Sequence, residues 1–172
     1  MAEQPIQLEL DQEITWEGKP VADGTKPLRA KVVKVAKMIG GPSGIVNKID
    51  ANAPEYYSLA GSVSDEECDF LLAMGLRKIR TNHEMAKKLK WSEQRVHDVA
   101  DHLGDYLGII RVDIYEDREE YILPIFAPGL LEIMVVSPNA EHHPEIRRAF
   151  NAYTHDRMQT MGPMLPNGYG LM

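Results

Sequence analysis

Three successive segments between residues 63 and 107 carry apolar positions at helical spacing, and each follows a hydroxyl residue suited to a helix start. Ser64 is followed by Glu67, and Thr81 is followed by Glu84. In such a capping box, the hydroxyl and the carboxylate each accept a hydrogen bond from a free N–H group of the helix start. Ser92 provides a third helix start. The segment after it has a continuous apolar stripe, formed by Val96, Val99, Ala100, Leu103 and Leu107. This pattern predicts three consecutive helices.

The apolar pattern changes its period after the third predicted helix, which Gly104 weakens and Gly108 ends. Residues 110–114 and 121–125 alternate between apolar and polar side chains, and the charged turn 116–118 joins them, which predicts a β-hairpin. Three helices, the last two joined by a short turn, followed by a hairpin predict an α+β winged helix-turn-helix. The predicted core comprises Phe70, Leu71, Met74, Met85, Leu89, Val96, Val99, Leu103, Ile110, Val112, Leu123 and Ile125.

The segments on either side of this pattern add further elements. Residues 28–39 form a basic amphipathic helix, a type that binds membranes, acidic partners or nucleic acid. Its short length and its lack of Trp or Phe favour a helix docked on the core, with its lysines in solvent. A helical turn is expected over residues 54–59, and Pro144 is suited to begin a helix that runs to about Gln159. Residues 130–136 fit either a strand or a short helix. We also expect one strand over Gln7–Leu10.

These elements divide the chain into three parts. Residues 1–62 are an N-terminal arm and the basic amphipathic helix, residues 63–159 are the winged-helix domain with its C-terminal helix, and residues 160–172 are a tail rich in Met, Gly and Pro. The tail is apolar without a pattern that would bury it, and such segments commonly mark contact sites. We expect it to be a connection to a further domain or a contact with a partner. The alternative is a lid folded back over the winged helix.

The overall composition is that of an ordinary globular protein, with 44% hydrophobic and 26% charged residues. The net charge of −7 argues mildly against a dedicated nucleic-acid binder. No apolar run approaches the ~20 residues that span a bilayer, and the acidic N-terminus does not resemble a signal peptide. We therefore expect a cytoplasmic protein. Cys68 is the only cysteine, so the chain contains neither an internal disulfide nor a cysteine-ligated iron–sulfur cluster, and we expect it to be buried.

The sequence contains no motif for a self-contained catalytic or metal site. The loop Gly40–Gly44 lacks the lysine of a phosphate-binding loop. His97 and His102 are five residues apart, which places them on different helix faces. His142 and His143, in a loop between two glutamates, do not have the spacing of zinc ligands. We expect this loop to be solvated, and we expect no catalytic residue, metal or cofactor in this chain.

Charge distribution weighs against DNA binding, the main alternative for a winged helix. Residues 92–107, which would enter the major groove, contain one arginine and four acidic residues. The hairpin, residues 111–120, contains two arginines and five acidic residues. Each acidic residue opposes the counterion release that drives DNA binding. A basic cluster nevertheless exists, formed by Arg77, Lys78, Arg80, Lys87, Lys88 and Lys90. A DNA-binding transcriptional regulator would use contacts from Arg77, Lys78, Arg80, Lys87, Lys88 and Arg95. We favour a non-catalytic interaction module over this alternative.

A set of spaced residues also resembles a known family. The positions are Thr81, Glu84, Ala86 and Leu89, then Ser92 and Val96, then Tyr121, Leu123, Pro124, Phe126, Pro128 and Gly129, and finally Phe150 and Tyr153. Over roughly residues 56–158, the chain resembles the N-terminal winged-helix segment of ferredoxin-type [4Fe-4S] proteins and related flavin/iron–sulfur oxidoreductases of anaerobic bacteria. The ending Leu-Pro-x-Phe-x-Pro-Gly is the most specific part of this pattern.

This resemblance implies an electron-transfer or redox protein whose [4Fe-4S] cofactor is bound by cysteine clusters beyond residue 172. The present sequence departs from the family because it has no such clusters. It is therefore expected to be either a piece of such a protein or a free-standing relative that acts as a binding module. Its partner would be a separate protein or the following domain of the same polypeptide.

Overall fold

The computed structural model describes residues 12–13, 21–22, 27–41 and 49–154. The helices in this part of the chain are α1 (Ala30–Ile39), α3 (Pro54–Ala60), α4 (Asp65–Met74), α5 (Asn82–Leu89), α6 (Glu93–Asp101), α7 (Leu131–Val136) and α8 (Pro144–Ala152). The strands are β1 (Gln12–Glu13), β2 (Val21–Ala22), β3 (Ile79–Thr81), β4 (Arg111–Ile114) and β5 (Glu119–Ile122). The predicted strand at Gln7–Leu10, the end of the predicted C-terminal helix and the tail 160–172 lie outside the described residues.

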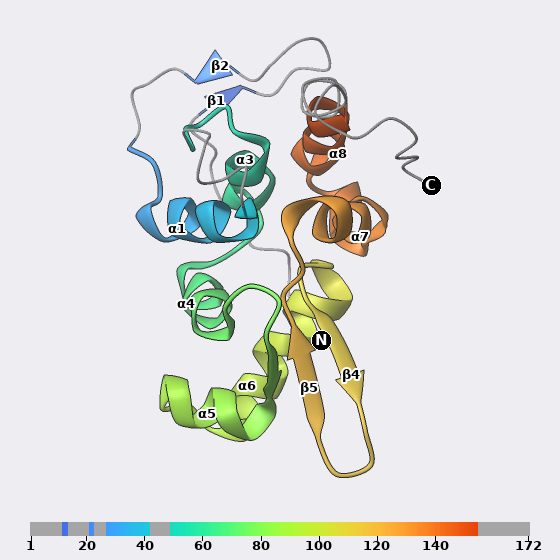
Figure 1. Ribbon diagram of the computed structural model, residues 1–172. Helices are drawn as coiled ribbons and strands as arrows, with labels where there is room; N and C mark the ends of the chain where they lie inside the picture. Colours follow the sequence, from blue (N-terminus) through green and yellow to red (C-terminus); the bar gives the residue numbers. More distant parts are fainter. Residues whose placement is uncertain (1–11, 14–20, 23–26, 42–48, 155–172) are drawn as a thin grey trace, which may run out of the picture.

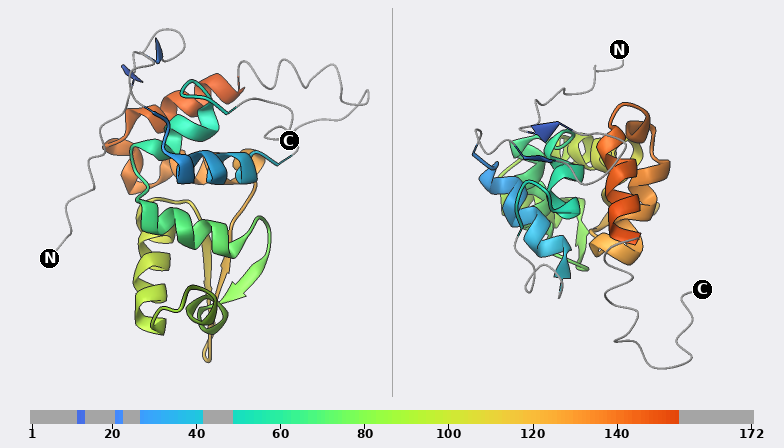
Figure 2. Two further views of the ribbon diagram at one scale, coloured as in Figure 1. Left: turned by 90° about the vertical axis from the view of Figure 1, so that its left-hand side faces the viewer. Right: turned by 90° about the horizontal axis from the view of Figure 1, so that it is seen from above.

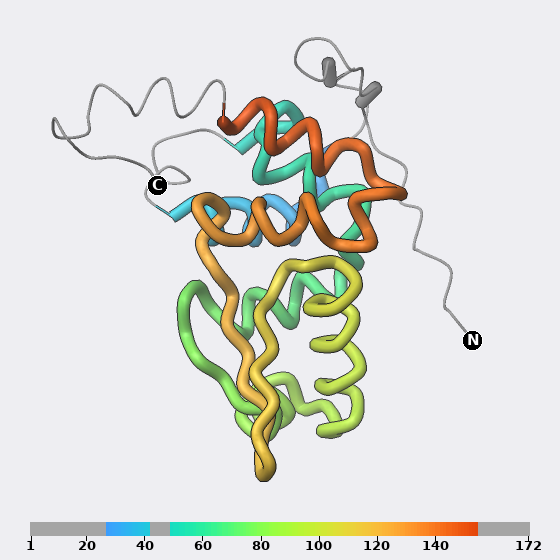
Figure 3. Tube along the Cα trace, turned by 90° about the vertical axis from the view of Figure 1, so that its right-hand side faces the viewer, coloured from blue at the N-terminus to red at the C-terminus, as the bar shows by residue number. Residues whose placement is uncertain are grey.

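One half of the molecule, which we call the sheet unit, consists of α4, β3, α5, α6, β4 and β5. Its three strands form an antiparallel sheet in the order β3-β5-β4. The predicted hairpin is confirmed, and its closing turn has a hydrogen bond of 2.8 Å from the Tyr115 N–H to the Arg118 carbonyl. The hairpin projects beyond α5 and α6 (Figures 1 and 3). The unit is α+β, and its element order is compatible with the predicted winged helix.

Strand β3 was not expected from the sequence, which predicted the Thr81 helix start and no strand before the hairpin. Two residues with positive φ, Gly75 at 73° and Arg77 at 55°, end α4 and turn the chain. This turn lets Ile79–Thr81 pair with β5, where Ile79 lies opposite Ile122. The sheet therefore has three strands rather than the two of the predicted hairpin.

The three predicted helix starts of the sheet unit are confirmed. The Ser64 hydroxyl accepts a hydrogen bond from the Glu67 N–H at 3.2 Å, and the Glu67 carboxylate accepts one from the Ser64 N–H at 2.7 Å. Thr81 and Glu84 form the same reciprocal pair, at 3.2 and 3.0 Å. The Ser92 hydroxyl accepts a hydrogen bond from the Arg95 N–H. These side chains satisfy N–H groups that each helix would otherwise leave free.

Two glycines fit the end of α6 against its neighbours. The helix continues as a wide turn over His102–Tyr106, where a Cβ added to Gly104 would lie only 2.8 Å from Cγ2 of Val112 in β4. Gly108 has a φ of 67°, and a Cβ there would lie 2.9 Å from the Ser137 Cβ. Gly104 thus permits close packing of the helix end on the hairpin, and Gly108 lets the chain turn into β4 beside the end of α7.

The other half, which we call the helical layer, consists of α1, α3, α7 and α8. Seen from above, α3 lies between α1 and α8 (Figure 2). The segment 130–136, which fits either a strand or a helix by sequence, is helical in α7. The apolar stripe predicted for the C-terminal helix is Ile146, Ala149, Phe150 and Tyr153, of which Phe150 is only partly buried and the other three are buried. The helical layer covers the end of the sheet unit that lies away from the hairpin tip (Figure 1).

The hydrophobic core is continuous through both halves. Nine of the twelve predicted core residues are buried, while Leu89, Val112 and Ile125 are only partly buried. The helical layer and the segment that leads from β5 into α7 contribute large buried side chains that the predicted core lacked, namely Ile39, Tyr57, Leu59, Phe126, Leu130, Met134 and Ile146. Among the described residues, no helix has the length and apolar character needed to cross a bilayer.

Candidate functional site

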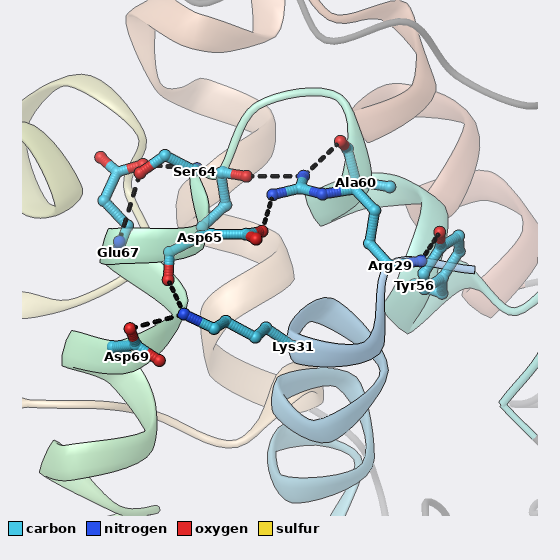
Figure 4. Close-up of polar contacts among 9 residues, drawn as sticks. Arg29, Lys31, Tyr56, Ala60, Ser64, Asp65, Glu67 and Asp69 are labelled. Atoms are coloured by element: carbon cyan, nitrogen blue, oxygen red, sulfur yellow. Dashed lines mark hydrogen bonds and ion pairs between the residues drawn. The ribbon is translucent and has the colours of Figure 1, made fainter. Parts of the chain in front are cut away.

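The basic helix α1 is docked on the molecule by its own charged residues. Figure 4 shows Arg29 reaching from the start of α1 to the connection between α3 and α4. Its guanidinium donates hydrogen bonds to the carbonyls of Ala60 at 3.0 Å and Val63 at 2.8 Å, and it forms an ion pair with Asp65 at 2.6 Å. Lys31 pairs with Asp69 of α4 at 2.6 Å. The prediction of a docked helix is confirmed, and part of its positive charge has a structural role.

The predicted nucleic-acid contacts lie in two places. Arg77, Lys78, Arg80, Lys87 and Lys88 lie on a basic flank formed by the end of α4, β3 and α5. Two of them are engaged at the carboxyl end of α4, where Arg80 donates a hydrogen bond to the Met74 carbonyl and Lys88 donates one to the Ala73 carbonyl. Helix ends leave such carbonyls free, and basic side chains there also interact favourably with the helix dipole.

Arg95 is separated from this flank. Its guanidinium pairs with the Glu66 carboxylate in the first turn of α4. Glu66 precedes Ala73 by seven residues, or about 11 Å along a helix. The structure therefore brings five of the six predicted residues to one flank and holds the sixth in an ion pair near the opposite end of α4.

A hydrogen-bond network joins α6 to the hairpin. Nδ1 of His97 lies 2.9 Å from the Glu119 carboxylate, and the Tyr121 hydroxyl donates a hydrogen bond of 2.7 Å to the same carboxylate. Asn82, at the start of α5, donates a hydrogen bond to the Tyr121 hydroxyl at 3.2 Å. The bond to Glu119 raises the pKa of His97 above its usual range. Burial opposes ionisation of Glu119, but the bonds from Tyr121 and His97 outweigh it and lower the pKa of that carboxyl.

The outer surface of α6 and the hairpin is acidic. Asp98, Asp101 and Asp105 follow one another at helical spacing and are all exposed. Both arginines of the hairpin pair with carboxylates of the same hairpin. Arg111 lies 2.9 Å from Asp113, and Arg118 lies 2.8 Å from Glu120 and 3.1 Å from Asp117. The positive charge that the hairpin could offer to a phosphate is therefore already engaged.

Two histidine–carboxylate pairs lie in less exposed positions. His102 pairs with Glu67, the buried carboxylate of the α4 capping box. Burial opposes ionisation of Glu67, but hydrogen bonds from His102 and Ser64 outweigh it and lower the pKa of this carboxyl. His143 pairs with Glu145 at 2.8 Å, and both are buried. The expectation that this loop is solvated is wrong for these two residues, because Pro144 begins α8 there and the first turn of that helix packs on the core. His142 and Glu141 are exposed.

The remaining candidate groups are the Cys68 thiol and the possible metal ligands. Cys68 is buried, as predicted, and burial raises the pKa of its thiol to about 12, so the nucleophilic thiolate is suppressed at neutral pH. No group of three or more His, Cys, Asp or Glu residues that could hold a metal ion occurs within the described ranges.

The network of His97, Glu119 and Tyr121 was not found by sequence reasoning. His97 and Glu119 are 22 residues apart in the chain, and neither belongs to a motif. One signal was available: the alternation of the second hairpin strand places Glu119 and Tyr121 on the same face. The contact to α6 depends on how the hairpin packs.

Comparisons of this chain with protein-family models, with curated proteins and with solved structures found no match. The resemblance to ferredoxin-type proteins stays a prediction.

Proposed function

We propose that this chain is a winged-helix module that binds a protein partner and has no catalytic role of its own. The proposal of this specific fold is supported by the order α4, β3, α5, α6, β4, β5 and by the β3-β5-β4 sheet. In this interpretation, α5 and α6 are the helix-turn-helix pair, and the β4–β5 hairpin is the wing.

The pairing of the arginines at the α6–hairpin surface is the observation that carries this proposal. A DNA-binding winged helix would direct this surface toward the phosphates. Here Arg95, Arg111 and Arg118 each pair with a carboxylate of the same chain. A phosphate contact would require each of these pairs to break, while exposed aspartates on α6 would repel the duplex. A DNA-binding alternative would therefore depend on the basic flank.

Fluorescence anisotropy with a labelled random duplex tests the proposal. We expect no binding at low ionic strength, where electrostatic association with DNA is strongest. If weak residual association is measured, Lys87→Gln on the basic flank should change it no more than Lys34→Gln, an exposed substitution on α1.

A contrary result would have three features. The duplex would bind at low salt, its affinity would fall steeply as salt rises, and Lys87→Gln would weaken it while Lys34→Gln would not. A base-reading role for Arg95 would also make its substitution cost about 1–3 kcal/mol at one base position. This result would favour the DNA-binding regulator.

We further propose that the module serves in a cytoplasmic [4Fe-4S] electron-transfer or redox protein, as its N-terminal part or as a free-standing relative. The resemblance of the hairpin ending Leu123–Gly129 and its flanking helices supports this setting. The partner would then be the cofactor-bearing domain. Elemental analysis and absorbance spectra of the purified chain should show neither stoichiometric metal nor flavin, and either signal would contradict a cofactor-free module.

A further inference from the structure

The two ends of the β4–β5 hairpin are held in the molecule to different degrees. At its base, residues 120–122 of β5 pair with β3, and Val112 lies so close to Gly104 that a Cβ there would be 2.8 Å away. Toward the turn, Ile114 is 75% exposed and Tyr115 is 47% exposed. The base is therefore fixed by the sheet and the core, while the outer half of the hairpin needs another attachment to keep its position.

Glu119 supplies an attachment at the boundary between these two parts. It precedes the residues of β5 that pair with β3, and it lies opposite Ile114 in the last pair of the ladder between β4 and β5. Its carboxylate lies 2.9 Å from Nδ1 of His97 on α6. The same carboxylate accepts a hydrogen bond of 2.7 Å from the Tyr121 hydroxyl, which accepts one of 3.2 Å from Asn82. One carboxylate thus joins the hairpin to α6 and, through Tyr121, to the start of α5.

The charge on His97 sets the strength of this attachment. Strand β5 presents the Glu119 carboxylate and the neutral Tyr121 hydroxyl to this site, and α6 itself contributes the carboxylates of Asp98 and Asp101. All three carboxylates favour the protonated imidazole, and the bond to Glu119 is the main reason that the pKa of His97 is raised above 6.5. Protonated His97 forms a charge-assisted bond to Glu119, which is stronger than the ordinary hydrogen bond of a neutral imidazole.

We propose that the bond between His97 and Glu119 is a pH-sensitive latch, which holds the outer half of the hairpin against α6 while His97 is protonated and loosens it when the proton is lost. The latch is complete between the ordinary pKa values of the two groups, 4.5 for glutamate and 6.5 for histidine. It weakens as pH rises through the raised pKa of His97 and as pH falls through the lowered pKa of Glu119. It is a property of the folded chain and does not depend on what the module binds.

Hydrogen exchange measured by mass spectrometry on the full chain tests the latch. Peptides covering residues 111–122 are compared at about pH 6 and about pH 8, on either side of the raised pKa, with rates corrected for the intrinsic effect of pH on exchange. We expect opening of the hairpin to be about two- to fivefold more frequent at the higher pH, the effect of weakening one largely exposed charge pair. Peptides from α1, which contains no histidine and lies in the helical layer, should not change.

Substitutions then assign the effect to the latch. His97→Gln and Glu119→Gln each remove the charge pair and leave a side chain that can still form hydrogen bonds. In both variants, corrected exchange of the hairpin should no longer depend on pH over this range. His83→Gln is the matched control, because His83 at the start of α5 forms a similar pair with Glu93 of α6, at 2.8 Å, that does not include the hairpin. This variant should keep the wild-type dependence.

Two results would overturn the inference. One is corrected hairpin exchange that stays constant while the imidazole of His97, followed by NMR, changes its protonation state. The other is loss of the pH dependence in His83→Gln as complete as in His97→Gln, which would mean that the contact between α6 and the hairpin is not its source. Neither result affects the proposed function, because that proposal is tested by binding of duplex DNA and by the presence of a cofactor.

Discussion

The sheet unit and the helical layer begin their helices by different means. In the sheet unit, α4, α5 and α6 each have a side-chain cap, from Ser64, Thr81 and Ser92. In the helical layer, none of the described helices α1, α3, α7 and α8 has one. A cap is a contact between residues close in sequence, so the sheet unit specifies its helices locally. The helical layer depends on packing between segments far apart in the chain, which is the usual source of stability for short helices.

The packing of the helical layer centres on the segment that follows the hairpin. Phe126 lies four residues after the end of β5. Its ring packs edge-to-face on Tyr153, and the two ring centroids are 5.4 Å apart. In the sheet unit, Phe70 stacks near Trp91, with centroids 6.2 Å apart. Since one continuous core contains both phenylalanines, we infer that the two halves stabilise each other despite their different helix starts.

The largest expected effect comes from removing Phe126. Phe126→Ala should destabilise the fold by about 3–5 kcal/mol, as is typical for a fully buried phenylalanine. Urea unfolding should be followed by far-UV circular dichroism and by Trp91 fluorescence in a Trp16→Phe background, which leaves Trp91 as the only tryptophan. Both midpoints should fall together, because the core is shared.

An exposed site provides the control for Phe126, because Val136→Ala on α7 should have little effect. If Phe126→Ala removed helical signal while the Trp91 midpoint stayed unchanged, the two halves would be separate folding units. The sheet unit and the helical layer would then be two domains, with a boundary between them.

The second effect concerns Gly108, which joins the two halves. Gly108→Ala should cost about 1–3 kcal/mol, because the added methyl meets the Ser137 Cβ at 2.9 Å and the Ile133 carbonyl at 3.1 Å. Gly75→Ala gives a comparison without a close contact, because the nearest neighbour of Gly75 is the flexible Lys78 side chain at 3.5 Å. Its φ of 73° and ψ of 151° lie in a region that glycine almost alone adopts, so backbone strain there should itself cost about 1–3 kcal/mol. A melting temperature of Gly108→Ala equal to that of the wild type would show that contact with α7 does not constrain Gly108.

The third effect concerns the contact between α1 and the sheet unit. Arg29→Met should cost about 2 kcal/mol, because it removes charged hydrogen bonds to the Ala60 and Val63 carbonyls in a part-buried position. Lys31→Met removes a more exposed ion pair with Asp69 and should have a clearly smaller effect. Thermal unfolding of both variants would decide. A larger loss from Lys31→Met would mean that charge, rather than the carbonyl contacts, docks α1.

The sheet unit could be predicted from the sequence more fully than the helical layer. The caps at Ser64, Thr81 and Ser92 and the alternation of the hairpin are local patterns, so the sheet unit could largely be predicted. Strand β3 could not, because its pairing with β5 depends on the turn conformation at Gly75 and Arg77. The helical layer was predicted as separate helices without the core that joins them.

The candidate site was also only partly predictable. The acidic surface of α6 and the hairpin follows from composition, but the pairing of Arg95 with Glu66 joins residues 29 positions apart. The sequence suggested that Arg95 could contact DNA, but in the structure its guanidinium is held by a carboxylate of α4. The buried pair of His143 and Glu145 was missed for a related reason: burial of the first turn of α8 depends on its tertiary packing and not on the polar loop that precedes it.

The smallest expected effects are pH-dependent and compare Glu67 with Glu119, each paired with a histidine. Both carboxyl groups have a lowered pKa in the folded protein. Each therefore contributes stability that is present above the unfolded pKa of about 4.5 and is lost as pH falls through the lower folded value. Glu67→Gln should flatten the acid side of the stability profile more than Glu119→Gln does, because Glu67 is more deeply buried and also belongs to the α4 cap.

The two variants should also differ at higher pH. The pKa of His97 is raised by Glu119, so this pair contributes stability that is complete below the unfolded histidine pKa of about 6.5 and is lost as pH rises through the folded value. Glu119→Gln removes the partner and should flatten the profile above pH 6.5, and His97→Gln should do the same. Urea unfolding at a series of pH values would measure both slopes. A profile of Glu119→Gln that keeps the wild-type slope above pH 6.5 would show that the bond between α6 and the hairpin does not contribute to folding.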